Sequence, residues 1–271
     1  MRVNIVGQDR SVLRATRGLI VIVACLIALP ASGEEGASAS ASASASASAD
    51  PIVFSLASIA PWAERTPDGE KRGLLVEMVR ELRARTGLPI RYQIRPHGRT
   101  LLELEEGVAD FVPTFAAPGL ERIGEYVGDI VTARVLVLGH VGDETIDSLD
   151  ALNGDNVGYL RGTWYGEVFE QNEQIHKVPV KDVAHGVELL RRGRLKALVS
   201  TEIAIPAAYD PESGENPPLD VMLELTRNHA KLYMSRRSDQ EKARARISRA
   251  LQAMHEDGTM DRLFANRFNG R

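Results

Sequence analysis

Short apolar runs alternate with amphipathic stretches along most of the chain. Runs rich in β-branched and apolar residues predict strands at 52–58, 90–96, 108–115, 133–140, 156–162, 176–181 and 195–201. The stretch "GLLVEMVRELRARTG" predicts a helix, because it places Leu75, Met78, Val79 and Leu82 on one face and ends at Gly87. Further helices are predicted at 99–107, 145–154, 163–172, 183–193, 238–258 and 259–268. Strands that alternate with helices of this length predict parallel sheets built from βαβ units.

The alternation falls into two successive α/β blocks, which predicts two lobes. We expect residues 51–133 and 225–271 to form lobe 1 and residues 134–224 to form lobe 2. The stretch at 221–237 predicts an extended segment that crosses between them. Ser238 or Asp239 is expected to cap the long helix that follows, and Gly258 to end it.

The N-terminal residues differ from the rest in composition. Arginines precede the apolar run "LIVIVACLIALP", and the small residues "ASG" follow it, which is the arrangement of a secretory signal peptide over residues 1–33. Cys25 lies in the apolar run, where "IVAC" partly resembles a lipoprotein cleavage site. Apolar residues continue after Cys25, so we expect it to be removed with the signal. The Ala/Ser repeat at 34–50 predicts a disordered linker, and the location predicted is periplasmic.

The charge balance argues against nucleic acid as a partner. Residues 1–33 hold four of the 33 basic residues and one of the 37 acidic residues. The remainder therefore has 29 basic and 36 acidic residues, a net charge of −7, with the basic residues scattered among acids. The six histidines show no HxxxH or HExxH spacing and there is no cysteine pair, so we expect neither a metal site nor a cofactor.

The order of the motifs resembles the periplasmic solute-binding proteins of the polar amino acid type, family 3. The resemblance runs from "APW" (60–62) through "LLELEEGVADFVPTF" and "LNGDNVGYLRGT" to "LQAMHEDGTMDRLFANRF". It implies a type II periplasmic-binding-protein fold of two α/β lobes, each a mostly parallel sheet flanked by helices, with the ligand in the cleft between the lobes.

The resemblance assigns Arg122 to the carboxylate of the ligand. In this family an arginine about a dozen residues after the aspartate at the strand start binds that group, and Asp110 and Arg122 have this spacing. A guanidinium suits the role because its planar fork pairs with both carboxylate oxygens. The alternative is a surface arginine paired with Glu121 or Glu125. The family's second carboxylate contact falls on Thr163 and Trp164, at an expected helix start where Thr163 would also serve as N-cap.

The sequence departs from the family where an amino acid's ammonium group is held. The acid expected after the strand at 195–201 aligns with Thr201, and Glu202 follows it. The aromatic that stacks on the ligand aligns with His97, and a second pocket aromatic aligns with Ile59. Thr114 keeps the one hydroxyl before Arg122. A ligand that has a carboxylate but no ammonium, or a modified amine, therefore fits these residues better.

Aromatic side chains are expected to form the walls of the site, chiefly Trp62, Phe115, Trp164 and Tyr165. We expect a monomeric binding protein, not an enzyme, that closes its cleft on a small carboxylate-bearing molecule and delivers it to an ABC permease. A role as the binding module of a membrane sensor is the first alternative. The second is a dehydratase-like enzyme on the same fold, with Glu202 or His97 as proton donor.

Overall fold

The structure is a computed structural model that describes residues 50–209 and 219–268. The expected signal peptide at 1–33, with Cys25, and the expected linker up to residue 49 lie outside the described residues. Within the described ranges, no helix combines the length and the apolar character needed to cross a membrane.

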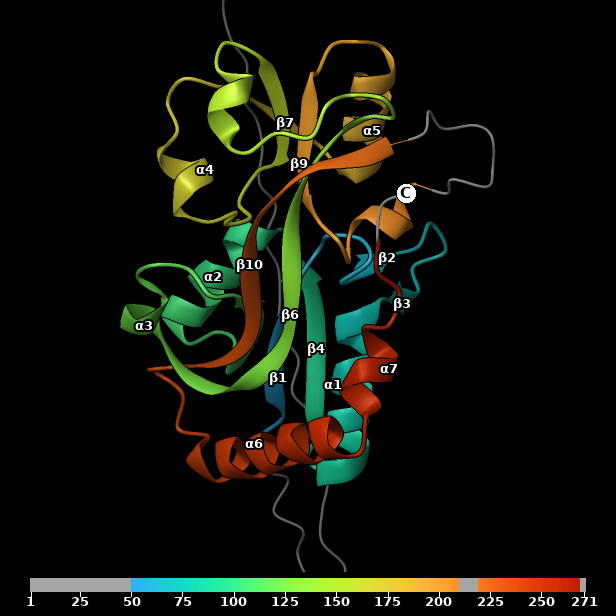
Figure 1. Cartoon of the computed structure of the whole chain (residues 1–271). Helices are drawn as coiled ribbons and strands as arrows, with labels where there is room; N and C mark the ends of the chain where they lie inside the picture. Colours follow the sequence, from blue (N-terminus) through green and yellow to red (C-terminus); the bar gives the residue numbers. More distant parts are fainter. Residues whose placement is uncertain (1–49, 210–218, 269–271) are drawn as a thin grey trace, which may run out of the picture. The chain divides into compact units, whose positions relative to one another are not determined.

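One mixed sheet of eight strands organises the described residues, in the order β4-β1-β5-β10-β6-β9-β7-β8. Its strands are β1 (Ile52–Ala57), β4 (Ile90–Arg95), β5 (Phe111–Phe115), β6 (Gly124–His140), β7 (Asn156–Leu160), β8 (His176–Val180), β9 (Ala197–Thr201) and β10 (Leu219–Ser235). β1 runs parallel to β4 and β5, and β7 runs parallel to β8 and β9. Between these two parallel groups, β10 and β6 form a long antiparallel pair (Figure 1).

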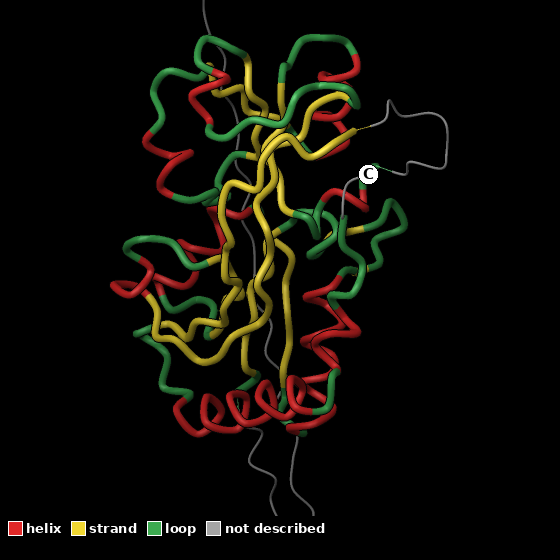
Figure 2. Tube along the Cα trace, in the orientation of Figure 1, coloured by secondary structure: helices red, strands yellow, loops and turns green. Residues whose placement is uncertain are grey.

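The helices follow the strands in the βαβ order predicted from the sequence. They are α1 (Leu74–Thr86), α2 (His97–Glu106), α3 (Leu120–Ile123), α4 (Glu167–Gln171), α5 (Val183–Arg191), α6 (Glu241–Glu256) and α7 (Thr259–Leu263), with 3-10 turns at Leu149–Leu152 and Ile205–Ala207. A short hairpin joins β2 (Glu64–Arg65) to β3 (Lys71–Arg72). Figure 2 shows the helices on the outside of the strands.

The amphipathic prediction for α1 is confirmed. The predicted apolar face, with Leu75, Met78, Val79 and Leu82, is buried, and Gly87 ends the helix in the left-handed conformation. Gly87 donates its backbone N–H to the carbonyl of Arg83 at 2.9 Å. A side chain with a Cβ atom is strained at this φ of 59°, so glycine is the residue that ends α1 at least cost.

Separate apolar cores lie along the β6–β10 pair. One core combines β1, α1 and α6 around Phe54, Met78 and Leu251. Others combine β7, β9 and α5 around Leu198, or β7 and α4 around Phe169. These cores lie toward the two ends of the β6–β10 pair, and together with the crossing strands they form the two-lobed α/β architecture that the sequence predicts. Ala47–Arg271 cluster as one compact unit, so the lobe boundaries at 134 and 224 stay a prediction.

Several local predictions were wrong. The helix expected at 145–154 is only a 3-10 turn over Leu149–Leu152. The strand expected from residue 133 begins at Gly124, because its first half pairs with β10. The helix expected from Thr163 begins at Glu167, after a loop that contains Gly166. Neither Ser238 nor Asp239 occupies the N-cap of α6, which is Gln240. Ser238 instead donates its hydroxyl to Asp110 at 2.7 Å.

Asp110, just before β5, forms hydrogen bonds with β1 and with the loop that precedes α6. One carboxylate oxygen accepts the backbone N–H of Val53 at 2.8 Å, and the other accepts the Ser238 hydroxyl. The backbone N–H of Asp110 also donates to the carbonyl of Val53 at 2.9 Å. Two segments far apart in sequence therefore depend on one half-buried carboxylate.

We expect Asp110→Ala to lower the free energy of unfolding by about 1–3 kcal/mol, because it leaves the Val53 N–H and the Ser238 hydroxyl without their charged partner. Urea denaturation measures the change, with Asp261→Ala on the exposed side of α7 as the matched loss of a carboxylate. Equal losses in the two variants would contradict this role for Asp110.

Candidate functional site

The carboxyl ends of four strands converge on one pocket, which we call the inner pocket. β1 contributes Ala57, β5 contributes Phe115, β7 contributes Leu160 and β9 contributes Thr201. This is where open α/β sheets place their ligands, because the loops that follow parallel strands meet at that edge. The full lining consists of Ala57, Ile59, Trp62, Leu75, His97, Pro113, Thr114, Phe115, Ile130, Leu160, Thr163, Tyr165, Val183, Ser200, Thr201, Ala204 and Ala230. The space between these residues is about 610 Å³, including its solvent-open part.

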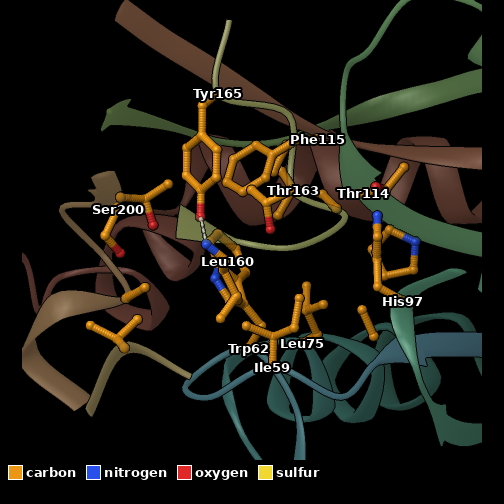
Figure 3. Close-up of a pocket in the computed structure, with 17 residues that line it drawn as sticks. Ile59, Trp62, Leu75, His97, Thr114, Phe115, Leu160, Thr163, Tyr165 and Ser200 are labelled. Carbon is orange, nitrogen blue, oxygen red and sulfur yellow. Dashed lines mark hydrogen bonds between the residues drawn. The ribbon is translucent and has the colours of Figure 1, made fainter. Parts of the chain in front are cut away.

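The inner pocket is lined by neutral side chains. Among its described lining residues there is no Asp, Glu, Lys or Arg. Aromatic rings form much of the wall: Trp62 meets Phe115 edge-on, with 5.3 Å between ring centroids. Figure 3 shows Phe115 and Tyr165 close together on one side of the pocket, with Ile59 and Leu75 on the other side. Such a surface favours an apolar ligand body.

Polar contacts in the inner pocket come from hydroxyl groups. Tyr165 is buried, and its hydroxyl accepts the backbone N–H of Leu160 at 3.3 Å (Figure 3). Burial raises the pKa of Tyr165 far above its ordinary value, against smaller opposing effects of hydrogen bonds with Leu160 and Thr163. The phenol therefore stays neutral. Thr114, Thr163, Ser200 and Thr201 add further hydroxyls around the same space.

Thr201 carries a hydroxyl that is buried and without a partner. The residue is 3% exposed, and its Oγ1 makes no hydrogen bond with any described residue. Since a buried polar group without a partner is unfavourable, this hydroxyl favours a ligand atom that completes it. Thr201 is fixed in place by the pairing of β9 with Val135 of β6.

His97 contacts the opposite side of the pocket. It is the first residue of α2, and its Cδ2 lies so close to Gly162 that a Cβ on Gly162 would come within 3.1 Å. Gly162 follows β7 with a φ of 87°, so both its conformation and this contact favour glycine. Burial lowers the pKa of His97, while a hydrogen bond with the backbone of Gly162 acts in the opposite direction.

The structure brings together most of the residues predicted for the site. The inner pocket is lined by Trp62, His97, Thr114, Phe115, Thr163 and Thr201. Thr163 lines it from a loop and not from a helix N-terminus, because α4 begins at Glu167. The alternative interpretation of Thr163 as an N-cap is therefore wrong.

Arg122 and Trp164 lie outside the lining. Arg122 is exposed on α3, with its guanidinium over Gly119, and it makes no ion pair with a described residue. Trp164 is half-buried, and its carbonyl accepts the Asn228 side-chain amide of β10. Their predicted contacts with the ligand stay predictions.

Glu202 points away from the inner pocket although Thr201 lines it. Its carboxylate accepts from Nε of Arg134 at 2.6 Å and also from Arg267. Burial raises the pKa of Glu202. The hydrogen bonds from Arg134 and Arg267 together lower the pKa by more than burial raises it, so the net shift is downward. An ionised carboxylate held in this way is poorly placed to bind an ammonium group or to donate a proton in the pocket.

Sequence reasoning missed Leu160 and Ser200 as lining residues. Each lies at or next to the end of a strand that was predicted, at 156–162 and 195–201. The position of strand ends was therefore a usable signal. Which side chain at each end faces the pocket depends on strand pairing, which the sequence does not show.

We expect Thr201→Val to stabilise the protein without ligand by about 1 kcal/mol, because it removes a buried hydroxyl that has no partner. Thr259→Val is the matched control and should destabilise, since the Thr259 hydroxyl accepts from Arg85 at 2.9 Å and from Arg262 at 2.8 Å. Guanidinium denaturation of both variants makes the comparison. A loss of stability in Thr201→Val would show that its hydroxyl is satisfied in the protein.

The lowered pKa of His97 sets the direction of a pH effect. The folded protein favours the neutral imidazole, so its contribution is complete above the ordinary histidine pKa of about 6.5 and is lost as the pH falls below it. We expect the wild type to lose more stability between pH 7.5 and 5 than His97→Gln, which does not titrate. NMR titration of the ring, assigned by its absence in His97→Gln, should give a midpoint below 6.5; a midpoint above 6.5 would contradict the burial effect.

The comparisons with known proteins agree with this geometry. Residues 52–270 match the sequence family described as bacterial extracellular solute-binding proteins, family 3. Comparison with curated protein sequences gives no match to the chain.

Three solved structures show the shared fold, at identities too low to carry more than the fold. The amino acid ABC transporter substrate-binding protein AbpA from Streptococcus pneumoniae, bound to L-arginine, has a TM-score of 0.64 and 17% identity over 79% of this chain and 93% of that chain. A histidine kinase sensor domain with similarity to periplasmic binding proteins has a TM-score of 0.68 and 16% identity, over 82% of this chain and 97% of that chain. The ancestral amino acid-binding protein AncCDT-1, a precursor of cyclohexadienyl dehydratase, has a TM-score of 0.66 and 17% identity, over 81% of this chain and 96% of that chain. The type II fold predicted from the sequence is thereby confirmed.

Proposed function

Because the chain belongs to the bacterial extracellular solute-binding proteins of family 3, we propose that it captures a small ligand in the inner pocket, outside the cytoplasm. The observation that carries the proposal is the lining itself. Residues from β1 and β5 meet residues from β7 and β9 around one space, and Thr201, one of these residues, has a buried hydroxyl without a partner among the described residues. A ligand in that space contacts both parallel groups of strands at once.

Binding acts by closing the cleft between the lobes. A ligand that touches both lobes binds the closed arrangement more tightly than the open one, so its binding energy favours closure. β6 and β10 are the segments that cross between the lobes and serve as the hinge. The His97–Gly162 contact, which joins α2 to the loop after β7, belongs to the closed arrangement.

The ligand proposed is a small molecule with a carboxylate, such as a modified amino acid or a simple organic acid. The hydroxyls of Thr114, Thr163 and Thr201 suit uncharged polar atoms of its body, and Trp62 and Phe115 suit the apolar part of that body. A free amino acid suits the pocket less, because an ammonium group would meet no acid in the described lining.

Delivery of the ligand to an ABC importer in the periplasm is the role proposed for the closed protein, as a monomer. The sensor-domain neighbour favours a second candidate, in which the closed protein reports the ligand to a membrane sensor. We expect no catalysis: Glu202, one of the two proton donors considered, lies outside the inner pocket and is held ionised by Arg134 and Arg267.

A thermal-shift panel of amino acids, N-acylated amino acids and small carboxylates tests ligand capture. A ligand at about 100 times its Kd adds about 2.7 kcal/mol, which corresponds to roughly 5–10 °C for a folded unit of this size. Small-angle scattering of the best hit should show compaction that Thr201→Val weakens. If no compound in the panel stabilises or compacts the protein, the proposal fails.

Deletion of the gene separates the two candidate roles. Loss of uptake of the labelled hit supports import, whereas loss of a transcriptional response with uptake unchanged supports sensing. Uptake and the transcriptional response are measured with the same compound, so each measurement serves as a control for the other.

A further inference from the structure

A second, outer compartment adjoins the inner pocket. Ile59, Leu160, Val183 and Ala204 line both, so the two spaces are neighbours. The outer compartment encloses about 1350 Å³, including its solvent-open part. Charged side chains line the outer compartment, whereas the described lining of the inner pocket contains none.

The acids of the outer compartment are already engaged. Glu64 accepts from Nε of Arg72 at 2.8 Å, within the β2–β3 hairpin. Asp182 caps α5 by accepting the backbone N–H of His185 at 2.8 Å, and it lies 3.9 Å from Nζ of Lys181. Each carboxylate therefore already has a partner within its own segment of the chain.

The arginines of the outer compartment are less well paired. Arg65 is exposed and makes no ion pair with a described residue. Arg95 approaches Glu103 at 3.4 Å, but Glu103 also receives Arg99 at 3.2 Å and the Ser55 hydroxyl at 2.6 Å. One carboxylate thus serves two guanidinium groups, which leaves positive charge at this end of the compartment.

The neighbouring Lys71 reports the same excess of positive charge. Burial lowers its pKa, and the charges of Arg65 and Arg95 lower it further. Lys71 also donates to the carbonyl of Tyr92 at 3.0 Å, which fixes the ammonium close to these arginines. The potential here therefore favours an anion.

We propose that the ligand is an amphipathic monoanion whose uncharged apolar body fills the inner pocket and whose carboxylate lies in the outer compartment, on Arg65 and Arg95. This inference rests on the proposed function and specifies its ligand. It differs from the assignment of the carboxylate to Arg122, which lies outside the described lining of both spaces. An ammonium group next to the carboxylate would lie near the same arginines and would be repelled.

A matched series of three compounds tests the ligand class: 3-phenylpropanoate, phenylalanine, which adds an ammonium group, and 3-phenylpropanamide, which removes the charge. A branched aliphatic series (4-methylpentanoate, leucine and 4-methylpentanamide) covers a smaller apolar body. Trp62 lines the inner pocket, so its fluorescence reports binding, with Trp164→Phe removing the other tryptophan. We expect the carboxylate to bind about tenfold or more tightly than either analogue.

Charge-removing variants locate the carboxylate. Arg65→Gln should weaken carboxylate binding about fivefold or more and make carboxylate binding less dependent on salt concentration. Binding of the uncharged amide should be unchanged. Arg95→Gln should act in the same direction. Arg83→Gln, on the exposed side of α1 and outside both described linings, is the matched control and should have no effect.

The inference would be overturned while ligand capture stands by tighter binding of the amino acid, by equal binding of the amide, or by loss of carboxylate binding in Arg122→Ala but not in Arg65→Gln. If neither series binds but another compound of the thermal-shift panel compacts the protein, the inference also fails alone. Only the absence of any stabilising or compacting compound removes both proposals.

Discussion

The antiparallel pairing of β6 with β10 is the constraint on which the rest of the structure depends. Seventeen residues of each strand run from Leu219 opposite His140 to Ser235 opposite Gly124. At one end β10 pairs with β5, and at the other β6 pairs with β9. Both parallel groups of strands are therefore held by the same two segments, and their carboxyl ends meet in one pocket. Register shifts along the pair, such as that between Ala230 and Lys231, give these strands places to bend.

The distribution of charge around the site follows from the energetics of burial. A buried charge is tolerated when it is paired, and Glu202 and Glu103 are each held by arginines and hydrogen bonds away from the inner pocket. What remains facing the pocket is neutral: aromatic rings, aliphatic groups and hydroxyls. Charge returns in the outer compartment, where solvent reduces the penalty. An apolar interior with a cationic entrance selects for ligands whose own polarity is arranged in the same order.

The structure also separates residues that are neighbours in sequence. Thr201 and Glu202 are adjacent, yet one lines the pocket and the other joins an ion cluster with Arg134 and Arg267. Successive side chains of an extended segment point to opposite sides, so only one of such a pair can face a ligand. In the loop before α4, Thr163 and Tyr165 likewise line the pocket while Trp164 between them does not.

The sequence alone determined the α/β class, the order of the elements and the type of fold, because these follow from local periodicity and from motifs in a fixed order. The resemblance to the family also pointed to His97, Thr114 and Thr201 as site residues, and all three line the inner pocket. Tertiary structure decided the rest: the start of β6 at Gly124, the loop position of Thr163, the exposure of Arg122 and the pairing of Glu202. These depend on strand register and on contacts between residues far apart in the chain, such as Arg267 with Glu202, which local patterns do not encode.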